Sequence, residues 1–242
     1  MKKSIMLAAA AMSVAFCLTS ARAAEDKRAW PWSPIGIGIA APIQLPYMSS
    51  DVYGLRLGGL FGYNNEMCGL DVGLVEISSY SMSGMQVSAF SWTDSDAYGL
   101  QYGGLANVVD GSFYGFQSAL VNVDWGEFWG LQHGAVNYDG SFFGVQFGAL
   151  ISWNNSVSAG WQTSLVNADQ EDFAGFAAGV VNYANKMTGF QLGVVNAAYE
   201  TTGFQLGAFN ATDKMHGVQI GVINLISSSS ALPAMIIANA SF

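Results

Sequence analysis

Apolar and polar residues alternate with a period of two inside a short phrase that recurs along the chain. Residues 189–196 read GFQLGVVN, residues 203–210 read GFQLGAFN, and residues 217–224 read GVQIGVIN. The first, third and fifth residues after each leading glycine are apolar, and Gln or Gly lies between them. Such alternation is typical of a β-strand with one apolar face, and the Val, Ile and Phe content also favours strands. We predict a strand in each copy, with the apolar side chains forming the core.

The same phrase, in degenerate form, runs along most of the chain. Its leading glycine recurs at spacings of 14, 15 or 16 residues, and self-similarity at such a period marks a repeat architecture. Two residues after the glycine, nine of the twelve copies carry Gln, and seven residues after it most later copies carry Asn. The Gln column consists of Gln86, Gln101, Gln117, Gln132, Gln146, Gln162, Gln191, Gln205 and Gln219, and the Asn column of Asn122, Asn137, Asn167, Asn182, Asn196, Asn210 and Asn224.

Two all-β architectures suit this pattern. In a parallel β-solenoid each copy makes one coil, and stacked coils bring equivalent residues to about 4.8 Å from one another. A Gln column on the outer face and an Asn column at a corner would then form hydrogen-bonded ladders. In an antiparallel outer-membrane β-barrel, apolar residues would face lipid and Gly and Gln would face the lumen. Antiparallel neighbours would send Asn alternately to two rims, so we predict a parallel solenoid of about 13 coils.

The ends of the chain differ from the repeats. Lys2 and Lys3 precede an apolar stretch at residues 4–20, and Ala21-Arg22-Ala23 fits a cleavage site, so we predict that residues 1–23 are a signal peptide. Residues 24–48 are expected to form a leader and an N-terminal cap strand, and residues 49–230 the repeat domain. Asn239 continues the Asn spacing, which predicts a C-terminal cap coil over residues 231–242.

Charge and candidate chemistry narrow the function. The 242 residues include 17 acidic and 8 basic side chains, for a net charge of −9 at pH 7, whereas nucleic-acid binding requires basic patches. We therefore exclude nucleic acid as a partner. His133 with Ser118 could form a base and a nucleophile, but we expect a buried histidine bonded to neighbouring hydroxyls. Carboxylate clusters such as Asp94 and Asp96 are expected to solvate turns rather than bind calcium. We predict a protein that is not an enzyme and has no catalytic residues, metal or cofactor.

Aromatic side chains precede the repeated glycine in four consecutive copies, at Tyr98, Tyr114, Trp129 and Phe143. In a solenoid they would climb along one edge. Exposed aromatic columns suit glycan rings, a partner protein or a membrane face, and the alternative is that they pack at a corner and bind nothing. We predict a binding edge at these four residues.

The tandem G-[FLV]-Q-[LI]-G-[VA]-[VF]-N phrase, with the N-terminal segment and the ending from Leu232-Pro233 to Phe242, resembles a family of bacterial surface-repeat proteins of spirochaetes and other diderm bacteria. The resemblance covers residues 53–242, and the early copies depart from it at Arg56 and Asp71. It implies no known activity. We expect an exported protein of the cell surface, outer membrane or periplasm, with a structural or interaction role. Its partners would be an envelope component, a glycan or a host protein, with membrane association open; the alternative is a small pore-forming or transport barrel.

Overall fold

The computed structural model describes residues 32–40, 43–47, 50–228 and 233–241. Within these ranges it consists of β-strands joined by short turns. The described residues contain no helix that is long and apolar enough to cross a membrane. The strands are β1 (Ser33–Ala40), β2 (Ile43–Leu45), β3 (Val52–Val72), β4 (Val75–Thr93), β5 (Ala97–Val109), β6 (Phe113–Ser118), β7 (Val121–Asn154), β8 (Ser158–Thr163), β9 (Val166–Ala178), β10 (Val181–Leu192), β11 (Val195–Leu206), β12 (Phe209–Ile226) and β13 (Ala234–Ser241).

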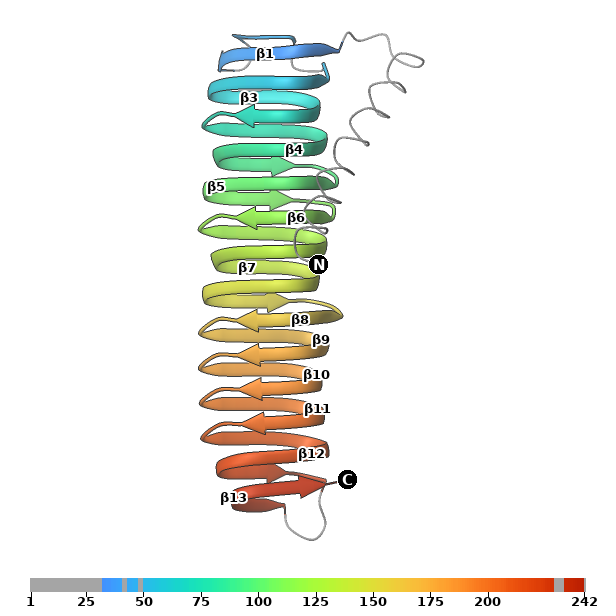
Figure 1. Cartoon of the computed structure of the whole chain (residues 1–242), viewed down its shortest axis with the longest axis vertical. Coiled ribbons are helices and arrows are strands. Elements are labelled where there is room, and N and C mark those ends of the chain that lie inside the picture. Colours follow the sequence, from blue (N-terminus) through green and yellow to red (C-terminus); the bar gives the residue numbers. More distant parts are fainter. Residues whose placement is uncertain (1–31, 41–42, 48–49, 229–232, 242) are drawn as a thin grey trace, which may run out of the picture. The chain divides into compact units, whose positions relative to one another are not determined.

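Consecutive copies pair in parallel and in register. Between β10 and β11, Val181 lies opposite Val195, Gly189 opposite Gly203, and Gln191 opposite Gln205. The same pairing of equivalent residues joins β3 to β4 and β11 to β12. The fold is therefore a parallel β-solenoid with about 12 turns in the described residues, as predicted. The antiparallel barrel alternative is wrong, because neighbouring copies run in the same direction (Figure 1).

The solenoid divides into two compact units, residues 1–131 and 132–242, here called unit 1 and unit 2. In unit 1, β1 pairs in parallel with β3, and β2 turns back antiparallel to β1. In unit 2, β13 runs antiparallel to β12 and places Asn239 opposite Gln219. The C-terminal segment thus closes the sheet with a reversed strand instead of a further parallel coil. The signal-peptide prediction lies outside the described residues.

The repeated glycine has a backbone conformation that only glycine adopts easily. All twelve copies have a positive φ, for example +134° at Gly203 and +115° at Gly99, in a region that L-residues rarely enter. A Cβ added at Gly203 would also overlap the carbonyl oxygen of Gly189 in the preceding coil. The glycine therefore lets adjacent coils approach closely, which explains its recurrence at every turn.

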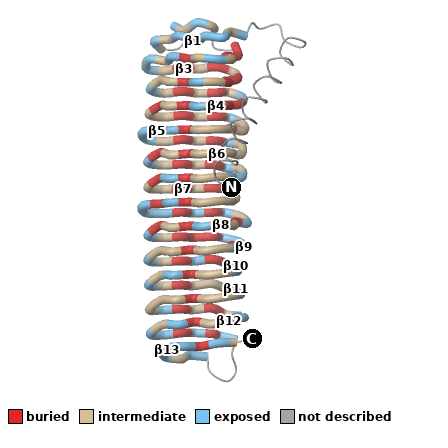
Figure 2. Tube along the Cα trace, viewed as in Figure 1, coloured by how far each residue is buried: buried red, intermediate tan, exposed pale blue. Residues whose placement is uncertain are grey.

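The interior of the coils is largely polar, and this corrects two predictions. We number positions from the repeated glycine, so that Gln205 is at +2 and Asn210 at +7. Gln205 is 0% exposed and Asn210 is 1% exposed, so the predicted placement of the Gln column on the outer face is wrong. Conversely, the apolar residues predicted for the core point outward: Leu192 at +3 is 40% exposed and Val194 at +5 is 50% exposed. Buried residues recur as short bands at equivalent places in successive coils (Figure 2).

The apolar part of the interior comes from position −2, two residues before the glycine. In unit 1 this position holds Phe113 and Phe128, whose rings stack with centroids 5.6 Å apart. In unit 2 it holds Phe173 and Met187, which are 1% and 0% exposed and form a cluster with Ala177 and Ala184. The core is therefore a narrow column of one large apolar side chain in most coils, packed beside stacked amides.

Candidate functional site

The buried Gln side chains form a ladder that runs along the coils. In unit 2, Gln219 Nε2 donates to Gln205 Oε1 at 2.8 Å, and Gln205 Nε2 donates to Gln191 Oε1 at 2.7 Å. In unit 1 the same bonds join Gln117 to Gln101 at 3.0 Å and Gln101 to Gln86 at 2.8 Å. Burying an amide is costly unless it is hydrogen-bonded, and stacking identical residues supplies a partner in the next coil. The interior thus tolerates Gln because the coils are in register.

The Asn column forms a second ladder with the opposite direction of donation. Asn196 Nδ2 donates to Asn210 Oδ1 in the following coil at 2.8 Å and also to the carbonyl oxygen of Leu206 at 2.9 Å. Asn182 and Asn210 repeat both contacts with their own next coils. The second bond satisfies a main-chain carbonyl where the strand ends and the coil turns. The Asn ladder therefore holds both the stack and the turn.

A carboxylate stands among the amides of unit 2. Asp169 is 1% exposed, and its Oδ1 accepts hydrogen bonds from Asn154 Nδ2 at 2.8 Å and from Gln162 Nε2 at 3.0 Å. Burial raises the pKa of Asp169 to about 7, although the two amide donors act to lower it. Asp169 is therefore a carboxyl whose protonation changes near neutral pH inside a sealed interior.

An ion cluster replaces the Gln ladder in the first coils of unit 1. Arg56 occupies position +2 and donates from Nε and Nη2 to the two oxygens of Asp71, at 2.7 Å and 2.6 Å. Its guanidinium also lies 2.5 Å from Glu76 Oε2 and donates to Asn64 Oδ1 at 2.5 Å. Burial and the Asp71 charge raise the pKa of Glu76 to about 8, and Arg56 opposes that shift. The cluster is thus a buried cation that contacts two carboxyl groups, of which Glu76 has a raised pKa.

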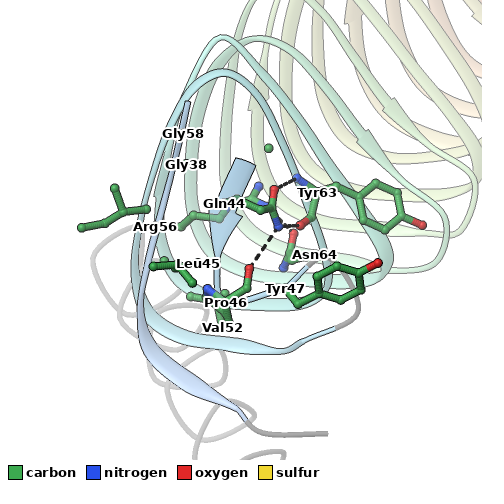
Figure 3. Close-up of a pocket in the computed structure, with 13 residues that line it drawn as sticks. Gly38, Gln44, Leu45, Pro46, Tyr47, Val52, Arg56, Gly58, Tyr63 and Asn64 are labelled. Atoms are coloured by element: carbon green, nitrogen blue, oxygen red, sulfur yellow. Dashed lines mark hydrogen bonds between the residues drawn. The ribbon is translucent and has the colours of Figure 1, made fainter. Parts of the chain in front are cut away.

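Beside this cluster lies a cavity of about 10 Å³ at the N-terminal end of unit 1 (Figure 3). Arg56, Asn64 and Gln44 contribute to its lining, and Gln44 accepts a hydrogen bond from the main-chain N–H of Tyr63 at 3.1 Å and donates to the carbonyl of the same residue. A cavity of this size holds about one water molecule. It is therefore too small for an organic ligand.

The outer face of unit 2 carries columns of large apolar side chains. We use the name outer face for positions +1, +3, +5, +6 and +8 of each coil. At +1, the rings of Phe176, Phe190 and Phe204 stack with centroid spacings of 5.4 Å and 5.2 Å, and Trp161 packs against Phe176 at 4.8 Å. At +5, the exposed fractions are 49% for Leu165, 45% for Val180, 50% for Val194 and 62% for Val222.

The outer face of unit 1 has the same character. At +5 and its equivalents, Leu74, Leu105 and Leu120 are 48%, 61% and 55% exposed. Leu57 and Tyr102 at +3 are 46% and 52% exposed. Isolated exposed apolar residues are normal on protein surfaces, but contiguous patches mark interaction sites. Each unit therefore presents a candidate interaction surface that the sequence pattern had assigned to the core.

In the described residues, exposed charge is confined to a different part of each coil, which we call the polar edge: the segment from position +10 to the residue before the next repeated glycine. In unit 2 the edge holds Glu171, Asp172, Lys186, Glu200 and Lys214, and Lys214 Nζ lies 2.6 Å from Glu200 Oε1. In unit 1 the exposed charges are Asp94, Asp110 and Glu127. Among the described residues, no Asp, Glu, Lys or Arg side chain occupies the outer face of either unit, although the imidazole of His133 lies on that of unit 2.

The predicted aromatic edge lies at position −1, which is the last position of the polar edge before the repeated glycine. In unit 1 the rings of Tyr98 and Tyr114 are parallel within 7° and 5.1 Å apart, and Trp129 is 46% exposed with its indole N–H bonded to Glu127 at 2.9 Å. Burial and the nearby Asp96 raise the pKa of Tyr98 to about 12, so it stays a neutral hydrogen-bond donor. Phe143 holds the same position in unit 2 and is half-buried.

The sequence also suggested a histidine and carboxylate clusters as candidate polar chemistry. His133 is exposed at position +3, so its predicted burial is wrong, because +3 belongs to the outer face. Among the residues that the structure describes, no three His, Cys, Asp or Glu side chains are grouped to hold a metal ion. Sequence reasoning missed the Trp161–Phe204 column, although its aromatic residues at one repeat position were a visible signal.

Comparisons with known proteins identified no relative of this chain. No family model, curated protein or solved structure matches this chain. The resemblance to the surface-repeat family therefore stays a prediction from the repeated phrase.

Proposed function

We propose that this chain is an exported, non-enzymatic repeat protein of the cell envelope, and that it works by presenting its outer face for interaction. The observation that carries the proposal is that the polar positions of the repeat are buried while its apolar positions are exposed. Gln191 and Asn196 are buried at 1% and 0% exposure, while Leu192 and Val194 between them are 40% and 50% exposed. A chain that buries amides and exposes aliphatic side chains in coil after coil has a surface suited to contact.

The interior supports a structural role for the polar residues. Asn196 and Gln205 bond to the equivalent amides of neighbouring coils, and Asn196 also bonds to a main-chain carbonyl, so these amides hold coils together. Export is supported by the basic start, the apolar stretch and the Ala21-Arg22-Ala23 pattern of the sequence. The repeated phrase adds its resemblance to surface-repeat proteins.

Export is tested by producing the full chain in a diderm bacterium and sequencing the N-terminus of the accumulated protein. We expect cleavage after Ala23 and recovery in the envelope fraction. An Ala23→Arg variant, which places a large charged residue at the cleavage site, should accumulate uncleaved. Recovery of the intact parent chain in the cytoplasm would contradict the proposal.

A second candidate is glycan binding at the aromatic edge, favoured by the parallel Tyr98–Tyr114 pair next to the exposed Trp129. Flat aromatic surfaces stack on sugar rings. The double variant Tyr114→Ala with Trp129→Ala should lose retention on envelope polysaccharide by about tenfold, if each ring contributes roughly 0.5–1.5 kcal/mol. Leu120→Ala, which removes an exposed apolar residue outside this edge, is the matched control. Equal retention of all three chains excludes this edge.

A further inference from the structure

We propose that the outer face of unit 2 contacts lipid hydrocarbon, with the polar edge left in water. This inference rests on the proposed envelope location and names the partner of the outer face. The chemistry of the partner follows from three properties of that face: it carries no Asp, Glu, Lys or Arg, it continues round a bend, and its main chain is already hydrogen-bonded.

The first property is the segregation of charge. From Phe173 to Ala184 and from Met187 to Ala198, no residue is charged, and the one charged residue between these stretches, Lys186, lies at the polar edge. The uncharged stretches contain the exposed columns of the outer face. Charged side chains such as Lys or Asp are strongly disfavoured at the centre of a bilayer, so a surface in contact with hydrocarbon is expected to lack them.

The second property is the curvature of the apolar surface. In each coil the outer face includes two strand segments and the turn that joins them, because β9 ends at Ala178 and β10 begins at Val181. Val180 in the turn is 45% exposed, Leu192 on one strand segment 40%, and Tyr183 on the other 40%. A rigid partner or a second copy of the chain covers one side of such a bend. Hydrocarbon is fluid and covers the whole of it.

The third property is that the main-chain polar groups at the turn are hydrogen-bonded within the protein. Val194 N donates to Val180 O at 3.0 Å, and Phe209 N donates to Val194 O at 2.9 Å, so the turn residues bond from coil to coil. The carbonyls of Leu192 and Leu206 beside the turn accept from the Asn ladder, both at 2.9 Å. Hydrocarbon admits only a backbone whose polar groups are satisfied internally. This turn meets the requirement in successive coils.

The polar edge supplies the water-facing side. Lys186, Glu200 and Lys214 lie on it, and Lys214 and Glu200 form an exposed ion pair at 2.6 Å. Charges of both signs sit there, so attachment should not depend on anionic lipid. We expect binding to uncharged phosphatidylcholine vesicles that is insensitive to salt.

The test is a vesicle flotation assay. The full chain is produced by cell-free synthesis in the presence of phosphatidylcholine vesicles, and the fraction that floats with the vesicles is measured. Val194→Lys places a charge on the outer face, and Thr202→Lys places the same residue on the polar edge, where the side chain is exposed. We expect the parent and Thr202→Lys to float, and the partition of Val194→Lys to fall about tenfold or more. Val180→Lys, at the equivalent position one coil earlier, should repeat the loss. Far-ultraviolet circular dichroism checks that each variant keeps its strands.

A depth measurement separates insertion from loose adsorption. Trp161 is 50% exposed at position +1 of the outer face. Vesicles with brominated acyl chains should quench the tryptophan fluorescence of the parent chain. The fraction of fluorescence that is quenched should be smaller in Trp161→Phe. Three outcomes overturn the proposal: equal flotation of Val194→Lys and Thr202→Lys, no quenching of Trp161, or a soluble parent that self-associates through this face without lipid. Each can occur with normal export, so failure here is distinct from failure of the envelope location, which cytoplasmic retention of the intact chain would show.

Discussion

The side-chain amide of Asn196 donates to Oδ1 of Asn210, its equivalent one coil further along, at 2.8 Å. Asn196 also donates to the carbonyl of Leu206 at 2.9 Å and accepts from Asn182 at 2.8 Å. It makes these three bonds at 0% exposure. One side chain therefore joins three coils and satisfies the main chain at a turn.

Removal of that amide should be costly. Asn196→Ala leaves the amide of Asn182 and the carbonyl of Leu206 without this partner, and each buried group left unsatisfied costs about 1–3 kcal/mol. We expect the free energy of unfolding to fall by about 2–5 kcal/mol, measured by urea denaturation with circular dichroism. Asn185→Ala removes an exposed Asn from the polar edge and should change stability by less than about 0.5 kcal/mol. Equal losses in the two variants would contradict a stabilising role for the ladder.

The repeated phrase predicted the strands and their parallel stacking, but it could not tell which face lay inside. Alternation of Phe204, Gln205 and Leu206 shows only that the two faces differ. The apolar face was assigned to the core because apolar burial dominates folding in water. In this solenoid, in-register coils let Gln205 and Gln219 each bond to the equivalent Gln of the preceding coil, so these amides are buried with hydrogen bonds between them. That compensation depends on coil-to-coil geometry, which one copy does not encode.

The candidate site was harder to predict for the same reason. Tyr98 and Tyr114 were visible as an aromatic column, and their rings do stack. The sequence does not reveal the larger outer face, because its pattern assigns Val180, Val194 and Val222 to the core. In the structure these side chains are 45%, 50% and 62% exposed. The ion cluster around Arg56 was visible only as a departure from the Gln column. Its partner Glu76 occupies a different repeat position and comes close only in the folded coil.

The repeated glycine should not tolerate any side chain. Gly99 has a φ of +115°, and a Cβ there would overlap the carbonyl oxygen of Gly84. Gly104 in the same unit has no positive φ in that range, and its nearest atom to an added Cβ is Ala89 Cα at 3.6 Å. We expect Gly99→Ala to lower the melting temperature strongly, with a cost of at least about 2 kcal/mol. Gly104→Ala should be neutral or slightly stabilising. A melting temperature unchanged by Gly99→Ala would refute this account of the repeat.

Asp169 should make stability depend on pH. Its pKa in the folded chain is about 7, above the roughly 3.9 of an unfolded chain, so the folded state binds the proton more tightly. The contribution of Asp169 to the free energy of unfolding is therefore fully present below about pH 4 and is lost as the pH rises through about 7. Asp169→Asn keeps an oxygen to accept from Asn154 and Gln162 and cannot ionise. At pH 8 we expect this variant to be more stable than the parent by roughly 1–4 kcal/mol, with the difference vanishing near pH 4.

The control for that titration is Asp172→Asn, which changes an exposed carboxylate three residues away. Its denaturation midpoint should follow the parent at every pH. If Asp169→Asn also follows the parent from pH 4 to pH 8, the buried carboxyl does not titrate in this range.

The Arg56 cluster allows the stability given by a buried ion pair to be compared with that given by an amide ladder at the same repeat position. Arg56→Gln removes the cation and leaves the carboxyl of Asp71, at 0% exposure, without its guanidinium partner, and removing one partner of a buried pair costs about 3–5 kcal/mol. The double variant Arg56→Gln with Asp71→Gln installs the side chains that Gln86 and Gln101 use one and two coils later, where they bond at 2.8 Å. Measurements at pH 6 keep Glu76 protonated, because its pKa is about 8. We expect urea denaturation to show a large loss for Arg56→Gln and recovery of most of it in the double variant. If the double variant is as unstable as the single one, the cluster has a role that an amide ladder cannot replace, such as setting the first coil against β1.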